Sequence, residues 1–577
     1  MKEIMILVLI SLTINSCGNI TDPESSETNS YDATEYSQTV SNAMDTNSGY
    51  HEDSGDYTWD SSTEVKITLN ETTISVDGSG ASVDGSTVTI TNAGNYNISG
   101  KLSDGQIVVD TDDSDVVRLI LNNVNITCAS SAPINIINAE KTILILADNS
   151  ENYIIDGNTY VFDNAEEDEP NAAIFSKDDL SIFGSGALII DANYNDGISS
   201  KDGLVINSGT ITINAVDDGI RGKDYLAIMD GTITITAAGD GMKSDNDEDE
   251  TMGYIYIEQG DINITAQTDA IDAQTDVLIS DGQFNLKSGG GSSRSVISSS
   301  SAKGVKGNVS VLIDDGNITA NSADDALHSN TSIVINGGEF NISTGDDGIH
   351  ADKSVIINDG TIIITKSVEG VEGNYITVNG GKISVVSSDD CFNSTAGSRT
   401  ERDDKSCTYI YGGYVVLNSS SGDGLDSNGS IVMKDGTVII HGPSNQPEVM
   451  IDYNGTFNIS GGLLVSSGSS SNMTQAPSSS SSQNSLKIMF RSASSASTIF
   501  HIEDSNGNDI VTFQPLHRYQ SVVFSSSKLV KGKSYNVYLG GSSTGENNDG
   551  LYTGGTYSGG TKSTSFTVSG TVTSFNI

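Results

Sequence analysis

An acidic residue recurs in this 577-residue chain directly before a small residue and a bulky apolar residue. The corner Asp196–Ile198 is followed by Asp218–Ile220, and Asp325–Leu327 is followed by Asp347–Ile349, each time 22 residues later. If each repeat is one rung of a coil, the acidic side chains form a column with neighbours about 4.8 Å apart. We call this set the acidic column: Asp196, Asp218, Asp240, Asp269, Asp325, Asp347, Glu369, Asp390 and Asp423.

Carboxylates at that spacing repel one another unless they are protonated, solvated or bridged by a cation. A hard divalent cation suits such oxygen ligands, so the sequence predicts calcium as a cofactor at one or more positions. The predicted metal ligands are Asp196, Asp218, Asp240, Asp269, Asp325, Asp347 and Asp390. The competing interpretation is ordinary turn chemistry, in which an aspartate before glycine bonds nearby backbone amides.

A second column consists of the residues that follow the apolar residue of each corner and should therefore point outward. We call it the outward column: Ser199, Arg221, Lys243, Asp272, Lys306, His328, His350, Glu372, Asn393 and Asp426. Cations are unexpected here because the net charge of the chain is −48. They either neutralise neighbouring aspartates as surface ion pairs or line a groove for a carboxylated polymer. The second interpretation predicts carbohydrate binding by Arg221, Lys243, Lys306, His328 and His350.

The same side chains also allow an enzyme, a polysaccharide lyase acting on a uronan by β-elimination. Calcium on a substrate carboxylate would acidify the α-proton, and Arg221, Lys223, Lys243 or Lys306 would accept it. Paired aspartates such as Asp389-Asp390 recur wherever the corner recurs, so we interpret them as architectural and assign no catalytic residue.

The elements that carry both columns are β-strands, because stretches such as Thr210–Ile213 and Thr232–Ile235 alternate with a period of two. We predict an all-β fold: a right-handed parallel β-helix with rungs of about 22 residues over 64–467. Insertions near 245–251, 288–299 and 394–406 interrupt the period. A Ser-rich linker over 468–485 and a small C-terminal β domain or cap over 486–577 should follow.

The N-terminus resembles a bacterial lipoprotein signal over 1–17, with a short apolar run from Ile4 to Ile14 and lipidation at Cys17. Plain secretion is the alternative, and both place the chain outside the cytoplasm. Residues 18–63 are polar and predict a disordered tether, which leaves Trp59, the only tryptophan, away from the coil. Cys391 and Cys407 bracket an insertion and could form a disulfide or remain two buried thiols.

Charge limits the possible partners. With 76 acidic and 28 basic residues, the chain should be repelled by nucleic acid and by anionic membrane surfaces. Contact with a membrane is expected only through a lipid anchor, and we expect a monomer.

Four short runs, 171–180, 303–306, 345–352 and 549–555, resemble the carbohydrate-binding-domain family of bacterial cell-surface parallel β-helix proteins. The resemblance covers about residue 64 to 577. It implies calcium, binding of cellulose-like or polygalacturonate chains, and likeness to polysaccharide lyases.

We therefore predict calcium-dependent binding of a polysaccharide at the cell surface. The lyase remains the alternative, and a surface adhesin or structural stalk is a third possibility.

Overall fold

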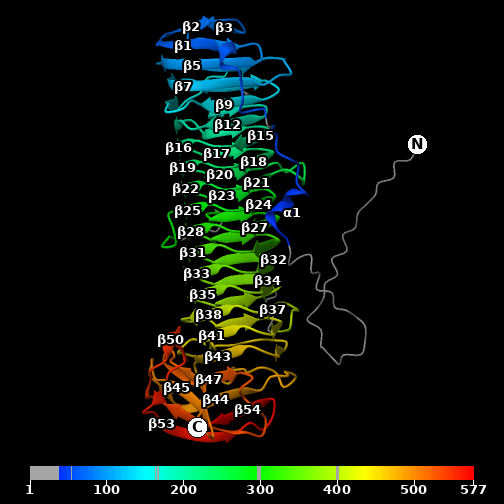
Figure 1. Ribbon diagram of the computed structural model, residues 1–577, viewed down its shortest axis with the longest axis vertical. Coiled ribbons are helices and arrows are strands. Elements are labelled where there is room, and N and C mark those ends of the chain that lie inside the picture. Colours follow the sequence, from blue (N-terminus) through cyan, green and yellow to red (C-terminus); the bar gives the residue numbers. More distant parts are fainter. Residues whose placement is uncertain (1–37, 54, 163, 165–167, 295–300, 398–401) are drawn as a thin grey trace, which may run out of the picture.

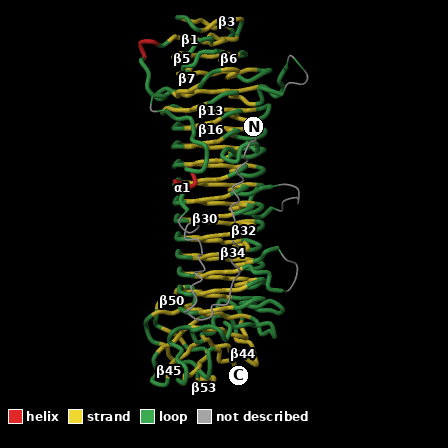
Figure 2. The backbone as a smooth tube through the Cα atoms, turned by 90° about the vertical axis from the view of Figure 1, so that its right-hand side faces the viewer, coloured by secondary structure: helices red, strands yellow, loops and turns green. Residues whose placement is uncertain are grey.

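The computed structural model describes residues 38–53, 55–162, 164, 168–294, 301–397 and 402–577. The described chain is almost entirely β-structure, and 46 of its strands belong to one continuous sheet. Successive rungs stack into a rod, with the first rungs at one end and the C-terminal residues at the other (Figure 1). Figure 2 shows the same strands from the side as a regular series of layers. Among the described residues, no helix is long and apolar enough to cross a membrane.

Each rung contributes strands to three parallel stacks. The first, which we call the corner stack, begins at the acidic corner and contains β4 (Thr87–Ile90), β6 (Gln106–Asp110), β8 (Ile134–Asn138), β11 (Ala172–Ser176), β14 (Asp196–Ser200), β17 (Ile220–Gly222), β20 (Met242–Ser244), β23 (Ile271–Ala273), β26 (Val305–Gly307), β29 (Leu327–Ser329), β32 (Ile349–Ile357), β34 (Val371–Val378), β36 (Phe392–Ser394) and β39 (Leu425–Ser427).

The second, the strap-covered stack, contains β1 (Val65–Glu71), β5 (Gly94–Leu102), β7 (Val117–Cys128), β9 (Thr142–Leu146), β12 (Leu180–Gly184), β15 (Gly203–Ile206), β18 (Tyr225–Ile228), β21 (Tyr254–Ile257), β24 (Asp276–Ile279), β27 (Ser310–Ile313), β30 (Ser332–Ile335), β37 (Cys407–Ile410), β40 (Ser430–Met433) and β42 (Phe457–Ile459). The second halves of β32 and β34 also belong to it.

The third, the alternating stack, contains β10 (Glu151–Asp156), β13 (Ala187–Ala192), β16 (Thr210–Ala215), β19 (Thr232–Ala237), β22 (Asp261–Ala266), β25 (Gln283–Ser288), β28 (Asn317–Ser322), β31 (Glu339–Thr344), β33 (Thr361–Lys366), β35 (Lys382–Ser387), β38 (Tyr414–Ser419), β41 (Thr437–His441) and β43 (Leu463–Gly468). The second halves of β5 and β7 begin it. Its strands bury every second residue, as in β19 and β22, so the core is a column of inward aliphatic side chains.

The register pairs Ile198 with Ile220 and Ile220 with Met242, so residues 22 apart lie side by side. The insertions leave this pairing intact, because Met242 pairs with Ile271, Ile271 with Val305, and Phe392 with Leu425. Each insertion is therefore a loop at the edge of a rung rather than a break in the coil.

The two ends of the coil are covered differently. At the N-terminal end, β2 (Thr73–Asp77) pairs antiparallel with β1, and β3 (Ala81–Asp84) pairs antiparallel with β4. At the C-terminal end, β47 (Tyr519–Ser525) pairs antiparallel with β43 and with β44 (Ser485–Ser494), and β54 (Val572–Asn576) joins β44. The remaining C-terminal strands form a six-stranded sheet and a two-stranded sheet: β45 (Phe500–Asp504), β46 (Asp509–Phe513), β48 (Ser534–Leu539), β49 (Ser542–Ser543), β50 (Glu546–Asn548), β51 (Leu551–Thr553), β52 (Tyr557–Ser558) and β53 (Thr561–Thr567).

The stretch expected to be a linker, 468–485, contacts the last rung instead of running free. Ser478 Oγ accepts a hydrogen bond from the Phe457 amide at 3.0 Å, and Ser481 Oγ accepts one from the Ile459 amide at 3.1 Å. Serine side chains thus satisfy the exposed edge of β42, which no further strand covers.

Residues 38–63 are not a disordered tether, and this prediction is wrong for the described part of that segment. We call the segment the strap: it includes the helix α1 (Val40–Met44) and the short 3-10 helix η2 (Ser61–Thr63), and it runs along the outside of the coil toward β1 (Figure 1). Gln38 contacts Asn336 at 2.9 Å, and Asp56 contacts Lys141 at 2.9 Å. Residues 18–37 and the predicted lipidation site Cys17 lie outside the described residues.

The strap packs against the coil because the strap-covered stack is apolar on both of its faces. Strands β15 and β18 are buried at every position, as expected for strands covered on both sides. Val40 is 1% exposed and packs with Leu278, Leu312, Val334 and Ile356. These unbroken apolar runs were the sequence signal that something covers this face.

Replacing Val40 with aspartate should therefore release the first part of the strap. Burial of a valine side chain contributes about 1.5–3 kcal/mol, which an aspartate on the same apolar surface forfeits. Hydrogen exchange of residues 38–50 should accelerate, while exchange in the rungs stays slow. The matched control is Ser41→Asp, at an exposed position of the same helix, and equal protection in both variants would contradict the role of Val40.

Cys391 is a free thiol, so it does not form the disulfide with Cys407 that was one of the two possibilities. Its Sγ lies 3.1 Å from Ser387 Oγ, and burial raises the pKa of the thiol to about 12. Cys391 simply fills the small-residue position of its corner.

Candidate functional site

The register places the whole outward column on one line. Ser199 pairs with Arg221, Arg221 with Lys243, and the pairing continues rung by rung to Asp426. The rings of His328 and His350, 22 residues apart, have centroids 5.1 Å apart. The predicted juxtaposition of two charged rows is therefore confirmed as geometry.

The acidic column lies immediately beside it, and its side chains are buried except at Glu369 and Asp390, which are half-buried. Asp196 is 1% exposed and Asp325 3%. One oxygen of each aspartate in the column accepts a backbone hydrogen bond from the next rung: the Asp240 amide donates to Asp218 Oδ1 at 2.7 Å, and the Asp347 amide to Asp325 Oδ1 at 3.1 Å. The bond from Asp423 to Asp390 is of the same kind, at 2.6 Å. The turn interpretation thus holds in a modified form, since the amide that each aspartate binds belongs to the next rung.

The second oxygen of these aspartates faces the outward column, where several cations meet it. Lys243 Nζ lies 2.6 Å from Asp240 Oδ2 and 3.6 Å from Asp218 Oδ2. Lys306 Nζ lies 2.9 Å from Asp272 Oδ1 and 3.6 Å from Asp269 Oδ2. These pairs match the expectation that the cations neutralise neighbouring aspartates.

Arg221 differs from the lysines, because its partner Asp245 belongs to the first insertion. Arg221 Nε donates to Asp245 Oδ1 at 3.2 Å, and the guanidinium makes a second contact with Oδ2. The arginine therefore ties the insertion to the corner stack.

Asp325 has the densest set of partners in the column. Its Oδ2 lies 2.8 Å from His328 Nδ1, 3.0 Å from Lys303 Nζ and 3.9 Å from His350 Nδ1. Burial would raise the pKa of Asp325, but the contacts with His328 and Lys303 outweigh it and hold the pKa below its usual range. Lys303 was missed at the sequence level, although it stands directly before Gly304 where the other corners have an acid.

Beyond His350 the charge pattern changes, because the outward column continues with Glu372, Asn393 and Asp426. Within the described ranges, Asp390, Asp423 and Asp426 form no ion pair with lysine, arginine or histidine. Carboxylate oxygens of Asp423, Asp426 and Asp452 all lie within 4.8 Å of one another. We call Asp390, Asp423, Asp426 and Asp452 the acidic section.

The pKa values of Asp423 and Asp426 lie above those of the aspartates that pair with a lysine or histidine. Burial, with Asp390 and Asp423 nearby, raises the pKa of Asp426 to about 9, and burial raises that of Asp423 to about 8. Glu372 is raised to about 10 by burial and by its hydrogen bond with Glu369. Burial also raises the pKa of other column members: Asp196 to about 8, Asp218, Asp269 and Asp347 to about 6, and Asp390 to about 7.

Among the residues that the structure describes, five groups of side chains have ligand atoms close enough to hold an ion together. They are Asp325 with His328 and His350; Asp347 with His350 and Glu372; Asp240 with Asp269 and Asp272; Asp324 with Asp325 and Asp346; and Asp423 with Asp426 and Asp452. Of the predicted metal ligands, Asp240, Asp269, Asp325 and Asp347 belong to such groups, whereas Asp196, Asp218 and Asp390 belong to none of them. The partners from the outward column, such as Asp426, were visible in the sequence but had not been assigned as ligands.

Three of the four candidate bases of a lyase, Lys243, Lys306 and Arg221, have an unfavourable environment for that role. Burial lowers the pKa of Lys243, but Asp218 and Asp240 outweigh it and raise the pKa overall. The pKa of Lys306 and that of Arg221 are raised in the same way, against burial, by Asp272 and Asp245 respectively. A general base needs the opposite shift, toward neutral pH.

Comparison with known proteins identifies the family of this chain. A family model described as "Carbohydrate-binding domain-containing protein" matches residues 84–348 and 346–499, which is more than half of the chain. A protein of the same description from Acetivibrio thermocellus is 48% identical over 203 residues, covering 35% of this chain and 71% of its own length. The chain therefore belongs to this carbohydrate-binding domain family.

A solved structure, described as the polysaccharide lyase-like protein from C. thermocellum in a gadolinium derivative, is 37% identical. The match covers 43% of this chain and 96% of the solved chain, with a TM-score of 0.40.

Proposed function

We propose that the protein binds an acidic polysaccharide through calcium held by the acidic section. The observation that carries this proposal is the change along one line of side chains. Up to His350 the aspartates pair with cations, whereas the buried Asp423 and the half-buried Asp426 have no cationic partner among the described residues. Carboxylates whose pKa is raised this far are destabilised as anions, and a bound divalent cation relieves that cost.

The donor set fits calcium. Asp423, Asp426 and Asp452 supply oxygen atoms only, and calcium takes six to eight oxygen ligands in flexible geometry. The remaining coordination positions of such an ion would be filled by water and by the carboxylates of a uronan. Calcium thereby allows a chain of net charge −48 to hold a polymer of the same sign.

The part of the outward column from Arg221 to His350, where the aspartates pair with cations, lies on the same line as the acidic section. The side chains of Lys243 and Lys306 are 26% and 22% exposed, so each is partly accessible from solvent. Uronate groups that extend beyond the calcium would meet Lys243, Lys306 and Arg221, and His328 and His350 when protonated. The polymer would then lie along the rod axis.

The test is retention of the protein on immobilised polygalacturonate. We expect retention in millimolar calcium and loss of at least about tenfold in affinity in EGTA, since the bridging ion is removed. Unchanged retention in EGTA would reject calcium bridging, and no retention in either buffer would favour the stalk. Unsaturated oligosaccharides released from polygalacturonate would instead favour the lyase.

Secretion, lipidation at Cys17, a monomeric state and right-handed winding of 22-residue rungs with a C-terminal cap belong to the same proposal. A cell-surface anchor would place the rod where polysaccharides are encountered. Labelling with a radioactive fatty acid, compared between the natural chain and Cys17→Ser, tests the anchor.

A further inference from the structure

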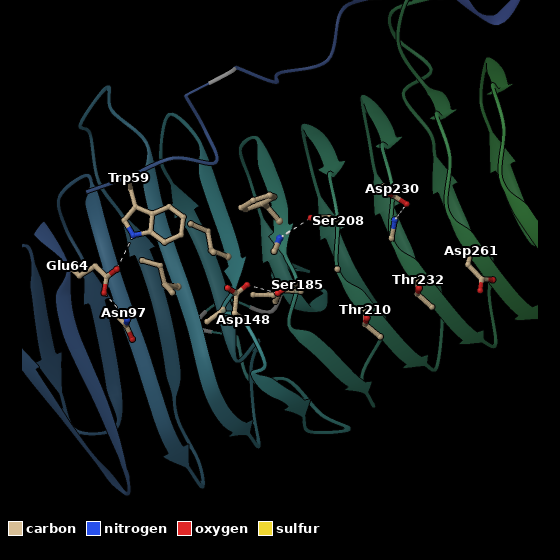
Figure 3. Close-up of a pocket in the computed structure, with 18 residues that line it drawn as sticks. Trp59, Glu64, Asn97, Asp148, Ser185, Ser208, Thr210, Asp230, Thr232 and Asp261 are labelled. Atoms are coloured by element: carbon tan, nitrogen blue, oxygen red, sulfur yellow. Dashed lines mark hydrogen bonds between the residues drawn. The ribbon is translucent and has the colours of Figure 1, made fainter. Parts of the chain in front are cut away.

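A groove of about 810 Å³ lies away from both charged columns, at the turns between the strap-covered stack and the alternating stack. Figure 3 shows it running across successive rungs from Trp59 to Asp261. Its volume is within the range of sites that bind small organic ligands. None of the proposals above uses it.

Trp59 forms one end of this groove, and its ring is positioned by a hydrogen bond and by packing. Its indole Nε1 donates to Glu64 Oε1 at 2.9 Å, and Glu64 Oε2 accepts from Asn97 Nδ2 at 2.8 Å. The ring packs against a cluster that includes Ile120 and Ile145, yet it remains partly exposed. The strap therefore brings to the coil the aromatic platform that the sequence had appeared to leave in a tether.

Glycines at three successive turns line the groove, together with Leu146 and Phe183. Gly184, Gly209 and Gly231 have φ values of 123°, 134° and 129°, which side chains of other residues rarely adopt. A Cβ on Gly184 would lie 2.2 Å from the Leu146 carbonyl oxygen. This close contact excludes a side chain at Gly184, so the backbone of the turn itself lines the groove.

Polar side chains repeat along one rim with the period of the rungs. Thr210 pairs with Thr232, and Thr232 pairs with Asp261, so one exposed oxygen-bearing side chain stands on each rung. Asp230 is labelled on the opposite side of the groove in Figure 3, and Asp148 lies nearer Trp59. A ligand that repeats along the rod axis would meet a similar group at each step of about 4.8 Å.

The charge of the groove selects against acidic ligands. None of the described residues that line it is a lysine, arginine or histidine, whereas Glu64, Asp148, Asp230 and Asp261 are carboxylic acids. Carboxylates accept hydrogen bonds from sugar hydroxyls and repel uronates. The site is thus opposite in preference to the proposed calcium-bridged surface.

We propose that this groove binds an uncharged pyranose chain along the rod axis, with one sugar ring stacked on Trp59. The apolar face of the sugar would cover the indole, and its hydroxyl groups would donate to Asp148, Asp230 and Asp261. The inference rests on the carbohydrate binding proposed above but assigns a separate site and a separate class of polymer.

Trp59 is the only tryptophan of the chain, so its fluorescence reports directly on the groove. The experiment titrates the full chain with cellohexaose in EGTA and follows tryptophan emission, with calorimetry in parallel. We expect a saturable change in emission for the natural protein. Trp59→Ala should weaken binding at least about tenfold by calorimetry, and Trp59→Phe should keep affinity within a few-fold because a ring remains.

The matched control is Tyr153→Ala, which removes a partly exposed aromatic ring of β10 that does not line the groove. It should bind as the natural protein does. Calcium-dependent retention on polygalacturonate by Trp59→Ala shows that this variant is folded, and circular dichroism serves if the polygalacturonate proposal itself fails.

Three results would overturn the proposal. They are tryptophan emission that does not change during cellohexaose titration, an affinity of Trp59→Ala equal to that of the natural protein, and binding of a galacturonate hexamer in EGTA as tight as that of cellohexaose. An emission change produced by calcium alone, with none produced by cellohexaose, would also overturn it, because the acidic rim would then be a cation site only.

Discussion

The double variant Asp423→Asn/Asp426→Asn should bind calcium about a hundredfold more weakly than the natural protein. Two of the three closest carboxylates of the acidic section lose their charge, and calcium affinity depends strongly on the number of charged ligands. Asparagine keeps a similar shape and an oxygen acceptor, so the Val449 amide, which donates to Asp423 Oδ1 at 2.6 Å, keeps a partner. Isothermal titration calorimetry with calcium alone measures the change.

The control is Asp435→Asn, which changes an exposed turn aspartate two residues beyond the end of β40. Its carboxylate accepts from the Gly436 amide at 2.8 Å and belongs to none of the ligand groups. Calcium affinity should be unchanged in this variant. Equal affinity in the double variant and the control would contradict a site at the acidic section.

The same site should show a marked dependence on pH. Because the pKa values of Asp423 and Asp426 are raised to about 8 and 9, calcium must displace protons at neutral pH. Affinity should therefore rise between pH 6.5 and 8.5, by up to about tenfold per unit for each proton released. Titrations in buffers of different ionisation enthalpy count those protons.

Stability without calcium should change in the opposite direction. A carboxyl whose folded pKa lies above its unfolded value stabilises the fold at low pH and loses that contribution as pH rises through the folded pKa. In EGTA, the free energy of unfolding should fall between about pH 4 and 9, by about 1.4 kcal/mol per unit for each such group. Calcium should oppose the fall, and a flat profile in EGTA would contradict the raised pKa values.

Asp325→Ala should destabilise the middle of the coil by about 3–5 kcal/mol, because removing one partner leaves buried cations uncompensated. The side chain is 3% exposed and holds His328, Lys303 and the Asp347 amide through its two oxygens. Its loss leaves Lys303, whose side chain is 13% exposed, facing only Asp324 at 2.7 Å. Urea unfolding, with hydrogen exchange of residues 303–371, measures the effect.

Two further variants separate charge from backbone bonding at this position. Asp325→Asn retains an acceptor for the Asp347 amide, so it should cost about 1 kcal/mol less than the alanine variant. Asp352→Ala removes an aspartate whose side chain is 59% exposed and which lies 3.6 Å from His350. That change should be nearly neutral, and a loss as large as that of Asp325→Ala would argue against the special place of Asp325.

The repeat alone determined the coil and the two columns of this protein. Side chains alternate across a strand and glycine permits the turns, and both are local properties that a sequence displays. Given the 22-residue step, the neighbours Arg221 and Lys243, or His328 and His350, follow without any knowledge of tertiary contacts. Membership of a carbohydrate-binding domain family is in keeping with that pattern.

Which carboxylates are free and which are paired was decided only by the tertiary structure. Lys303 stands at a position that is acidic in the other corners, and it pairs with Asp324 and Asp325. Asp245, in the first insertion, pairs with Arg221. These contacts depend on side-chain reach and burial, which the repeat does not encode. They separate the neutralised part of the line from the acidic section.

The strap is the other feature that only the tertiary structure decided. It carries no repeat, and its contacts span up to 298 positions, as between Gln38 and Asn336. Its polar composition is typical of disorder, but the apolar outer face of the strap-covered stack offsets the entropy of ordering it. Trp59 reaches the groove for that reason alone.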